Sequence, residues 1–107
     1  MEPDVRIVLV TAPSDAVGLD VARAVVGEGL AACVNVVPGL RSVYRWEGAV
    51  EEADEVLLVL KTRADRVDTL RERVVSLHPY DVPEFVVVPV EGGLERYLAW
   101  IRTEAAP

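Results

Sequence analysis

The spacing of apolar residues along the chain predicts an alternation of strands and helices. Runs rich in β-branched and aromatic residues predict strands at 6–11, 31–37, 40–46, 50–60 and 84–90. Apolar residues three and four positions apart predict helices from about Asp15 to Glu28, from Thr62 to Leu77, and around Leu94–Ile101.

Turn and cap residues divide these elements. Pro38 and Gly39 are expected to turn the chain after the strand 31–37. The next two strands are expected to form a long hairpin around Glu47–Ala49. Thr62 with Asp65 resembles a capping box that opens the second helix. The resulting order, β-α-β-β-α-β plus a C-terminal helix, predicts a ferredoxin-like split βαβ fold of the α+β class. At 107 residues, we expect a single domain spanning 1–107.

Two of the expected strands are apolar at both odd and even positions, and therefore on both faces of the sheet. This pattern predicts assembly. Val56–Leu60 and Phe85–Val88 have no polar position to face water, as is typical of strands that are buried on both faces. The two main helices can cover only one face of the sheet. A homo-oligomer that packs sheet against sheet is therefore expected.

Composition and charge exclude some classes of partner. The chain has 18 acidic and 11 basic residues and a net charge of −7, so we expect neither nucleic acid nor an anionic membrane as a partner. The acidic N-terminus lacks the basic region of a signal peptide, and no apolar run approaches the ~20 residues of a membrane span, so a cytoplasmic location is expected. Only Lys61 among the basic residues is Lys, and Gln is absent. This usage fits a thermophile, and a GC-rich genome explains it equally well.

Several short motifs, in order along nearly the whole chain, are similar to those of one family. They are Thr11–Pro13, Leu30–Asn35, Pro38–Gly39, Val43–Gly48, Glu55–Leu58, Leu60–Thr62, His78–Glu84 and Tyr97–Ile101. Together they resemble the CutA family of divalent-cation tolerance proteins. The resemblance implies a ferredoxin-like protomer, a tight cytoplasmic homotrimer, and an architecture related to the trimeric PII-type signalling proteins. It also implies tolerance of copper and other divalent metals, with copper binding.

Cys33, His78 and Glu84 are the candidate metal ligands, because thiolate, imidazole and carboxylate groups all bind copper or zinc. For Cys33 we favour the interpretation as a small apolar strand residue, whereas His78 can equally be a side chain that caps a helix end. The resemblance has gaps, since some members have Cys and a second His where this chain has Val10 and Leu77. We expect copper to bind weakly through His78 at the surface, without an essential role for Cys33.

A second set of residues mixes aromatic rings with one ammonium and one carboxylate, as small-ligand pockets do. Its members are Tyr44, Trp46, Lys61, Thr62, Tyr80, Glu84 and Trp100. Lys61 suits either a phosphate group or Glu84 as its partner. The set fits an interface between subunits as well as a ligand pocket, and a cleft between subunits serves as both.

Three functions remain open at this point. They are a trimeric metal-binding protein, a PII-like sensor of a small anionic ligand, and a scaffold that docks a partner protein. The sequence has no GxSxG, HExxH, CxxC, Walker A or GxGxxG motif, so we expect neither an enzyme nor an organic cofactor.

Overall fold

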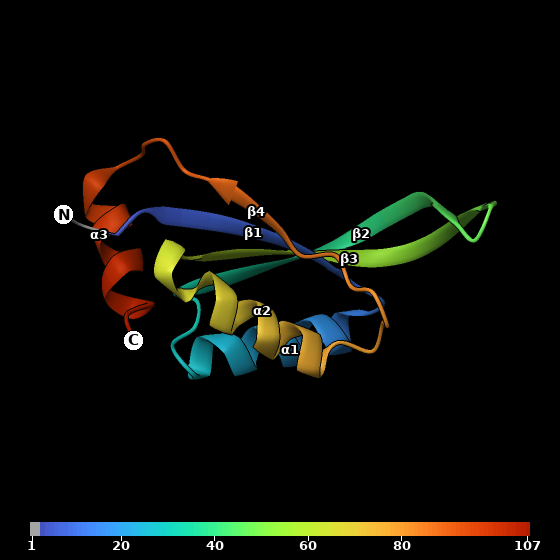
Figure 1. Cartoon of the computed structure of the whole chain (residues 1–107), viewed down its shortest axis with the longest axis horizontal. Coiled ribbons are helices and arrows are strands. Elements are labelled where there is room, and N and C mark those ends of the chain that lie inside the picture. The colour runs from blue at the N-terminus through green and yellow to red at the C-terminus, as the bar shows by residue number, and fades with distance from the viewer. Residues whose placement is uncertain (1–2) are drawn as a thin grey trace.

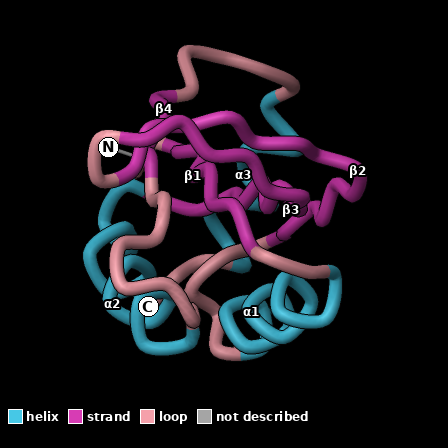
Figure 2. The backbone as a smooth tube through the Cα atoms, turned by 90° about the vertical axis from the view of Figure 1, so that its right-hand side faces the viewer, coloured by secondary structure: helices cyan, strands magenta, loops and turns pink. Residues whose placement is uncertain are grey.

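The computed structural model describes residues 3–107, which form a four-stranded antiparallel sheet with two helices packed on one face (Figures 1 and 2). The strands are β1 (Val5–Ala12), β2 (Cys33–Trp46), β3 (Ala49–Arg63) and β4 (Val86–Pro89). The helices are α1 (Asp15–Gly27), α2 (Val67–Leu77) and α3 (Glu95–Glu104), and a 3-10 turn, η1 (Ala64–Arg66), precedes α2. The strand order β2-β3-β1-β4 confirms the predicted split βαβ fold. No helix within residues 3–107 is long and apolar enough to span a membrane.

The core lies between the sheet and the helices α1 and α2. On the sheet side, Val8, Val10, Leu58 and Leu60 are fully buried, because they occupy alternate positions of the two central strands. The helices contribute apolar residues at four-residue spacing, namely Val21 and Val25 in α1 and Leu70 and Val74 in α2. The periodicity in the sequence therefore identified the core correctly.

The expected turn at Pro38–Gly39 is wrong, because the chain continues in the same direction there. Val37 pairs with Leu57 and Leu40 pairs with Glu55, so β2 has one more residue than β3 between these pairs. This is a β-bulge, and Gly39 takes the positive φ of 79° that the irregularity requires. Strands 31–37 and 40–46 are thus one long strand, β2.

The expected capping box at Thr62 is also wrong. Thr62 lies near the end of β3, is fully buried, and donates a hydrogen bond of 2.7 Å to the carbonyl of Leu30. Asp65 instead pairs with Arg63, at 2.7 Å. Helix α2 begins after η1, and no described side chain caps its first turn.

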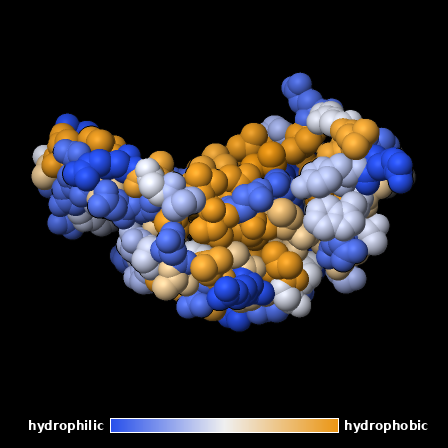
Figure 3. Space-filling view, turned by 180° about the vertical axis from the view of Figure 1, so that it is seen from behind, coloured by the Kyte–Doolittle hydropathy of each residue, from blue (hydrophilic) through white to orange (hydrophobic). Residues whose placement is uncertain are grey.

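The face of the sheet opposite the helices, which we call the outer face, carries a continuous set of apolar side chains. It is formed by Ile7, Leu9, Leu57, Val59, Val86 and Val88, which align across neighbouring strands. Val86 and Val88 are 48% and 37% exposed. Figure 3 shows hydrophobic side chains gathered across the hollowed middle of the molecule. Helix α3 packs at one end of the sheet through Ile101 and leaves Val86 and Val88 uncovered.

The predicted long hairpin is confirmed, and β2 and β3 project well beyond the rest of the chain. It makes the molecule 46 Å long against widths of 25 and 23 Å (Figure 1). Its surface carries both charged and apolar side chains: Arg41 lies 3.0 Å from Glu52 and 3.1 Å from Asp54, and Val43 and Val50 are exposed. Glu47 and Gly48 turn the chain at its tip with positive φ values of 50° and 82°.

Candidate functional site

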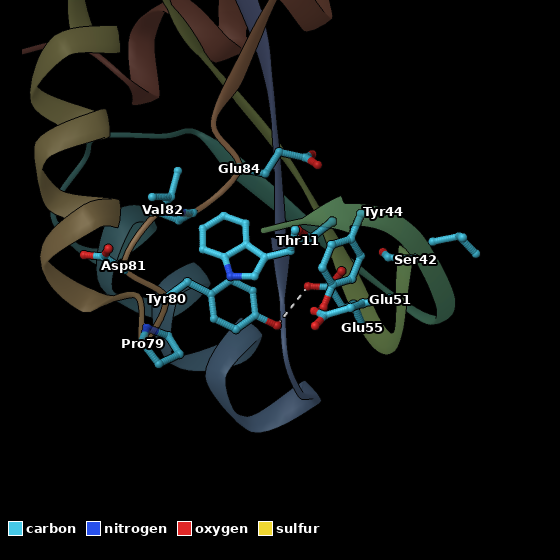
Figure 4. Close-up of a pocket in the computed structure, with 13 residues that line it drawn as sticks. Thr11, Ser42, Tyr44, Glu51, Glu55, Pro79, Tyr80, Asp81, Val82 and Glu84 are labelled. Carbon is cyan, nitrogen blue, oxygen red and sulfur yellow. Dashed lines mark hydrogen bonds between the residues drawn. The ribbon is translucent and has the colours of Figure 1, made fainter. Parts of the chain in front are cut away.

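An open pocket of about 810 Å³ lies between the projecting hairpin and the loop that joins α2 to β4 (Figure 4). The hairpin lines it with Ser42, Val43, Tyr44, Trp46, Glu51 and Glu55, the loop with 79–84, and β1 with Thr11. Tyr44 and Glu51 lie directly opposite each other in the register of β2 and β3. The antiparallel pairing of the hairpin therefore brings aromatic rings and carboxylates to the same wall.

His78 holds the loop side of the pocket in place. Its imidazole is buried, with Nε2 2.7 Å from the carbonyl oxygen of Thr11 and Nδ1 accepting the backbone N–H of Tyr80 at 3.1 Å. Because a carbonyl only accepts, Nε2 carries the proton. The His78 and Tyr80 rings also pack together, with centroids 4.7 Å apart. These contacts position the Tyr80 hydroxyl to donate to Glu55, at 3.0 Å (Figure 4).

The electrostatic character of the pocket is negative. Glu55 is only 9% exposed, and burial together with this carboxylate raises the pKa of Tyr80 to about 12. Burial, and then the neighbouring Glu55, raises the pKa of Glu84. Burial and Glu51 raise the pKa of Tyr44 in the same way. Among the described residues that line the pocket, none is Lys or Arg.

Comparison with known proteins places the chain in a family. Residues 6–104 match the family described as CutA1 divalent ion tolerance protein. The chain belongs to the CutA1 family. The resemblance that the motifs indicated is therefore confirmed, and the protein is a CutA-family divalent-cation tolerance protein.

Relatives of this CutA1 chain come from distant organisms. It is 52% identical to the divalent-cation tolerance protein CutA of Thermus thermophilus, over 91% of this chain and 94% of that protein. It is 47% identical to human protein CutA over 87% of this chain, and there it spans about half of the relative, 52%. The solved structure of the Thermus thermophilus protein covers 95% of this chain and 99% of its own, with a TM-score of 0.94 at 49% identity. The structure of CutA1 from Oryza sativa gives 0.95 at 43% identity, covering 98% and 96%.

The fold brings together four residues of the predicted aromatic and charged set in this CutA1 chain. They are Tyr44, Trp46, Tyr80 and Glu84, and all four line the pocket. Glu51 and Glu55 also line the pocket and were not predicted from the sequence. The hairpin register was the signal that could have found them, because alternate positions on facing strands share one face.

The other three predicted members lie elsewhere. Lys61 is on the outer face, where it donates a hydrogen bond to Asn35 and lies 3.8 Å from the Cys33 sulfur. Thr62 is buried in the core, and Trp100 lies on α3 with its ring 5.5 Å from that of Tyr97. Within one chain, the expected pairing of Lys61 with Glu84 is therefore not formed.

The three predicted metal ligands do not meet within one CutA1 protomer. Cys33 lies half-buried on the outer face, His78 beneath the loop, and Glu84 at the pocket. Within residues 3–107, no group of three His, Cys, Asp or Glu side chains is arranged to hold a metal ion. His78 is not at the surface as expected, and its side chain bonds to β1 rather than to the end of α2.

Replacing His78 with Ala is expected to lower the free energy of unfolding by about 2–4 kcal/mol, because a buried ring and two hydrogen bonds are lost. Denaturant unfolding of both proteins, with and without a strong chelator, measures the loss. An architectural role gives the same loss in both conditions. A loss that disappears with the chelator would show that His78 stabilises the protein through bound metal instead.

Replacing Glu84 with Gln is expected to stabilise the protein at neutral pH and to have little effect below pH 4. The folded protein raises the pKa of Glu84 above 4.5, so it binds the proton more tightly than the unfolded chain does. Stability from this group is complete at low pH and declines as pH rises through the raised pKa. Thermal unfolding of both proteins from pH 3.5 to 8 checks this, and parallel curves would contradict it.

Proposed function

We propose that this chain acts as a homotrimer that contributes to divalent-cation tolerance by binding copper or another divalent cation. The observation that carries the proposal is the outer face, an apolar surface that the protomer leaves uncovered. Metal ligands drawn from more than one subunit would complete sites that one chain lacks. Membership of the CutA1 family supports both parts.

Assembly follows from the chemistry of the outer face. Val86 and Val88 lie on an edge strand, and an exposed apolar edge without a partner favours association with another chain. Lys61 lies on the same face, and its side-chain partners in residues 3–107 are an amide and a thiol rather than a carboxylate. A second copy packed on this face covers the apolar residues and can supply the missing acid. The number three comes from the family resemblance.

Binding of a divalent cation is supported by charge and by donor chemistry. A net charge of −7 attracts cations in general. Cys33, His78 and Glu84 remain the candidate ligands, and the trimer determines which of them approach one another. Because His78 already uses both ring nitrogens, a metal that binds there must displace one hydrogen bond, which weakens its affinity.

Enzyme activity, cofactors, other partners and cellular location are also part of the proposal. We propose a non-enzymatic protein of the cytoplasm, with no organic cofactor and no nucleic-acid or membrane partner. A free thiol at Cys33 is compatible with a reducing compartment. Fractionation of the source cells, with a compartment marker, checks the location.

The alternative function is a PII-like sensor or a scaffold, and the pocket between the hairpin and the α2–β4 loop is the place within one chain where a small ligand fits. The pocket lining has carboxylates and no Lys or Arg among the described residues, so it argues against the small anionic ligand that the sequence suggested. A thermal-shift screen of phosphorylated metabolites checks this, because a ligand of the folded state raises the midpoint.

Copper titration against a competing chelator tests the proposal at neutral pH. We expect the assembled protein and its Cys33→Ser variant to bind copper weakly, and a monomeric variant to lose most of that binding. Zinc is titrated in parallel to compare metals. Binding no tighter than the buffer, or equal binding by the monomer, would overturn the proposal of shared sites. Loss of binding in Cys33→Ser alone would show a thiolate site.

A further inference from the structure

The pocket between the hairpin and the α2–β4 loop has the size and shape of a small-molecule site. Its volume of about 810 Å³ is far larger than a bare ion needs and lies within the range of small-ligand pockets, roughly 300–1,000 Å³. Two separate elements form its walls, and His78 ties the loop wall to β1. This contact holds the loop wall of the pocket in place within the protomer.

The charge of this pocket selects the sign of a ligand. Glu51, Glu55, Asp81 and Glu84 line it, and the described lining includes no Lys or Arg. Glu55 is more than nine-tenths buried, and its hydrogen-bond partner in the described chain is the neutral hydroxyl of Tyr80. A buried carboxylate without a cationic partner is costly. A positively charged ligand beside Glu55 would remove that cost.

The aromatic side chains of the pocket select the kind of cation. Tyr44, Trp46 and Tyr80 line it and keep 39%, 47% and 37% of their surface exposed. Aromatic faces attract ammonium and guanidinium groups, and they also contact apolar carbon. By contrast, the pocket carboxylates provide no group of three ligands for a metal ion within residues 3–107.

We propose that this pocket binds a small organic cation, an ammonium compound that has an apolar body. The charged nitrogen lies beside Glu55 and Glu51, and its carbon substituents lie against the rings of Tyr44 and Trp46. The Tyr80 hydroxyl donates to Glu55 and fixes the carboxylate that faces the ligand. This site does not depend on metal binding, and the copper titration above can fail while this proposal holds.

A pair of probes that differ in charge alone tests the proposal. Choline carries a quaternary ammonium, and 3,3-dimethylbutan-1-ol is its neutral carbon isostere. Calorimetric titration uses the full chain in its native assembly, at neutral pH and low salt. We expect choline to bind at least about tenfold more tightly than the alcohol, because only choline gains the carboxylate and ring attraction.

Three variants assign the binding to this pocket. Glu55→Gln keeps an oxygen that accepts the Tyr80 hydrogen bond and removes the charge, so choline affinity is expected to fall about tenfold. Tyr44→Leu removes a ring and is expected to weaken binding several-fold, whereas Tyr44→Phe keeps the ring and the affinity. Asp20→Asn is the matched control: it removes one negative charge on α1, away from the pocket, and is expected to change nothing.

Three other results of these titrations would each contradict the proposed cation site. Equal binding of choline and the alcohol would show that charge is not recognised. Absence of choline binding at millimolar concentration would show that the pocket is closed or filled in the assembly. An equal loss in Asp20→Asn and Glu55→Gln would reduce the effect to net charge. Circular dichroism of each variant confirms that the fold is retained.

Discussion

A Val86→Glu variant is expected to be a monomer, with a mass near 11.7 kDa by light scattering, where the wild-type protein gives about three times that mass. Val86 is 48% exposed in the protomer and lies on the outer face beside Leu9. Assembly on this face would bury the introduced carboxylate against apolar side chains, at a cost of about 4 kcal/mol or more. That cost raises the dissociation constant by roughly a thousandfold.

Val75→Glu provides a matched control for that variant. Val75 is also 48% exposed, and it lies on α2, on the opposite side of the sheet. The Val75→Glu protein is expected to keep the wild-type mass. If both variants stay assembled, the outer face is not the interface. If the wild-type protein itself is a monomer, the trimer proposal is wrong.

The fold was predictable from the sequence because the residue types that favour strands and helices occur in the same segments as the apolar patterns that determine burial. β-Branched and apolar residues occupy every position of 7–12 in β1 and of 56–60 in β3, and alternate members of these runs form the core and the outer face. Gly29, just after α1, takes a positive φ of 71° and ends the helix, which the sequence predicted to extend to about Glu28. The same double-sided apolar pattern predicted an uncovered face, which the protomer shows.

The two errors in the fold arose where a local motif has two structural uses. Pro-Gly marks turns, yet at Pro38–Gly39 it marks a bulge inside a strand, because the residues on both sides continue to pair with β3. Thr62 with Asp65 matches a cap pattern, yet the Thr62 side chain bonds to Leu30 across the fold. Partners this far apart in sequence are set by tertiary packing, which a short motif does not contain.

The site was predictable only in part, for the same reason. The motifs identified Tyr44, Trp46, Tyr80 and Glu84 but not which of the other candidates they meet. The alternation of side chains along a strand determines which candidates share a face. Odd positions of β3 as far as Lys61 lie on the outer face, and Thr62 lies on the core side. A register drawn from the hairpin turn would have placed Glu51 opposite Tyr44. The role of His78 depends on the end of β1, which no local pattern reveals.

Replacing Trp46 with Ala is expected to weaken the trimer by about 2–4 kcal/mol while changing protomer stability much less. Trp46 is 47% exposed and lies at the end of β2, on the hairpin that projects from the sheet. Nearly half of the Trp46 surface is uncovered in the protomer, so burial of that surface would contribute to an interface rather than to the monomer fold. A partly exposed Trp on a projecting arm is typical of the anchors that dominate subunit interfaces. Dissociation on dilution, followed by analytical ultracentrifugation, measures the change.

The second tryptophan supplies the comparison. Trp100 is 42% exposed, which is close to the value for Trp46, but it lies on α3 and packs against Tyr97 of the same helix. Trp100→Ala is therefore expected to lower protomer stability and to leave the dissociation constant nearly unchanged. If Trp46→Ala leaves assembly unchanged as well, Trp46 serves the pocket alone and the hairpin is not an interface arm. If Trp100→Ala dissociates the trimer instead, the interface lies at the α3 end of the sheet.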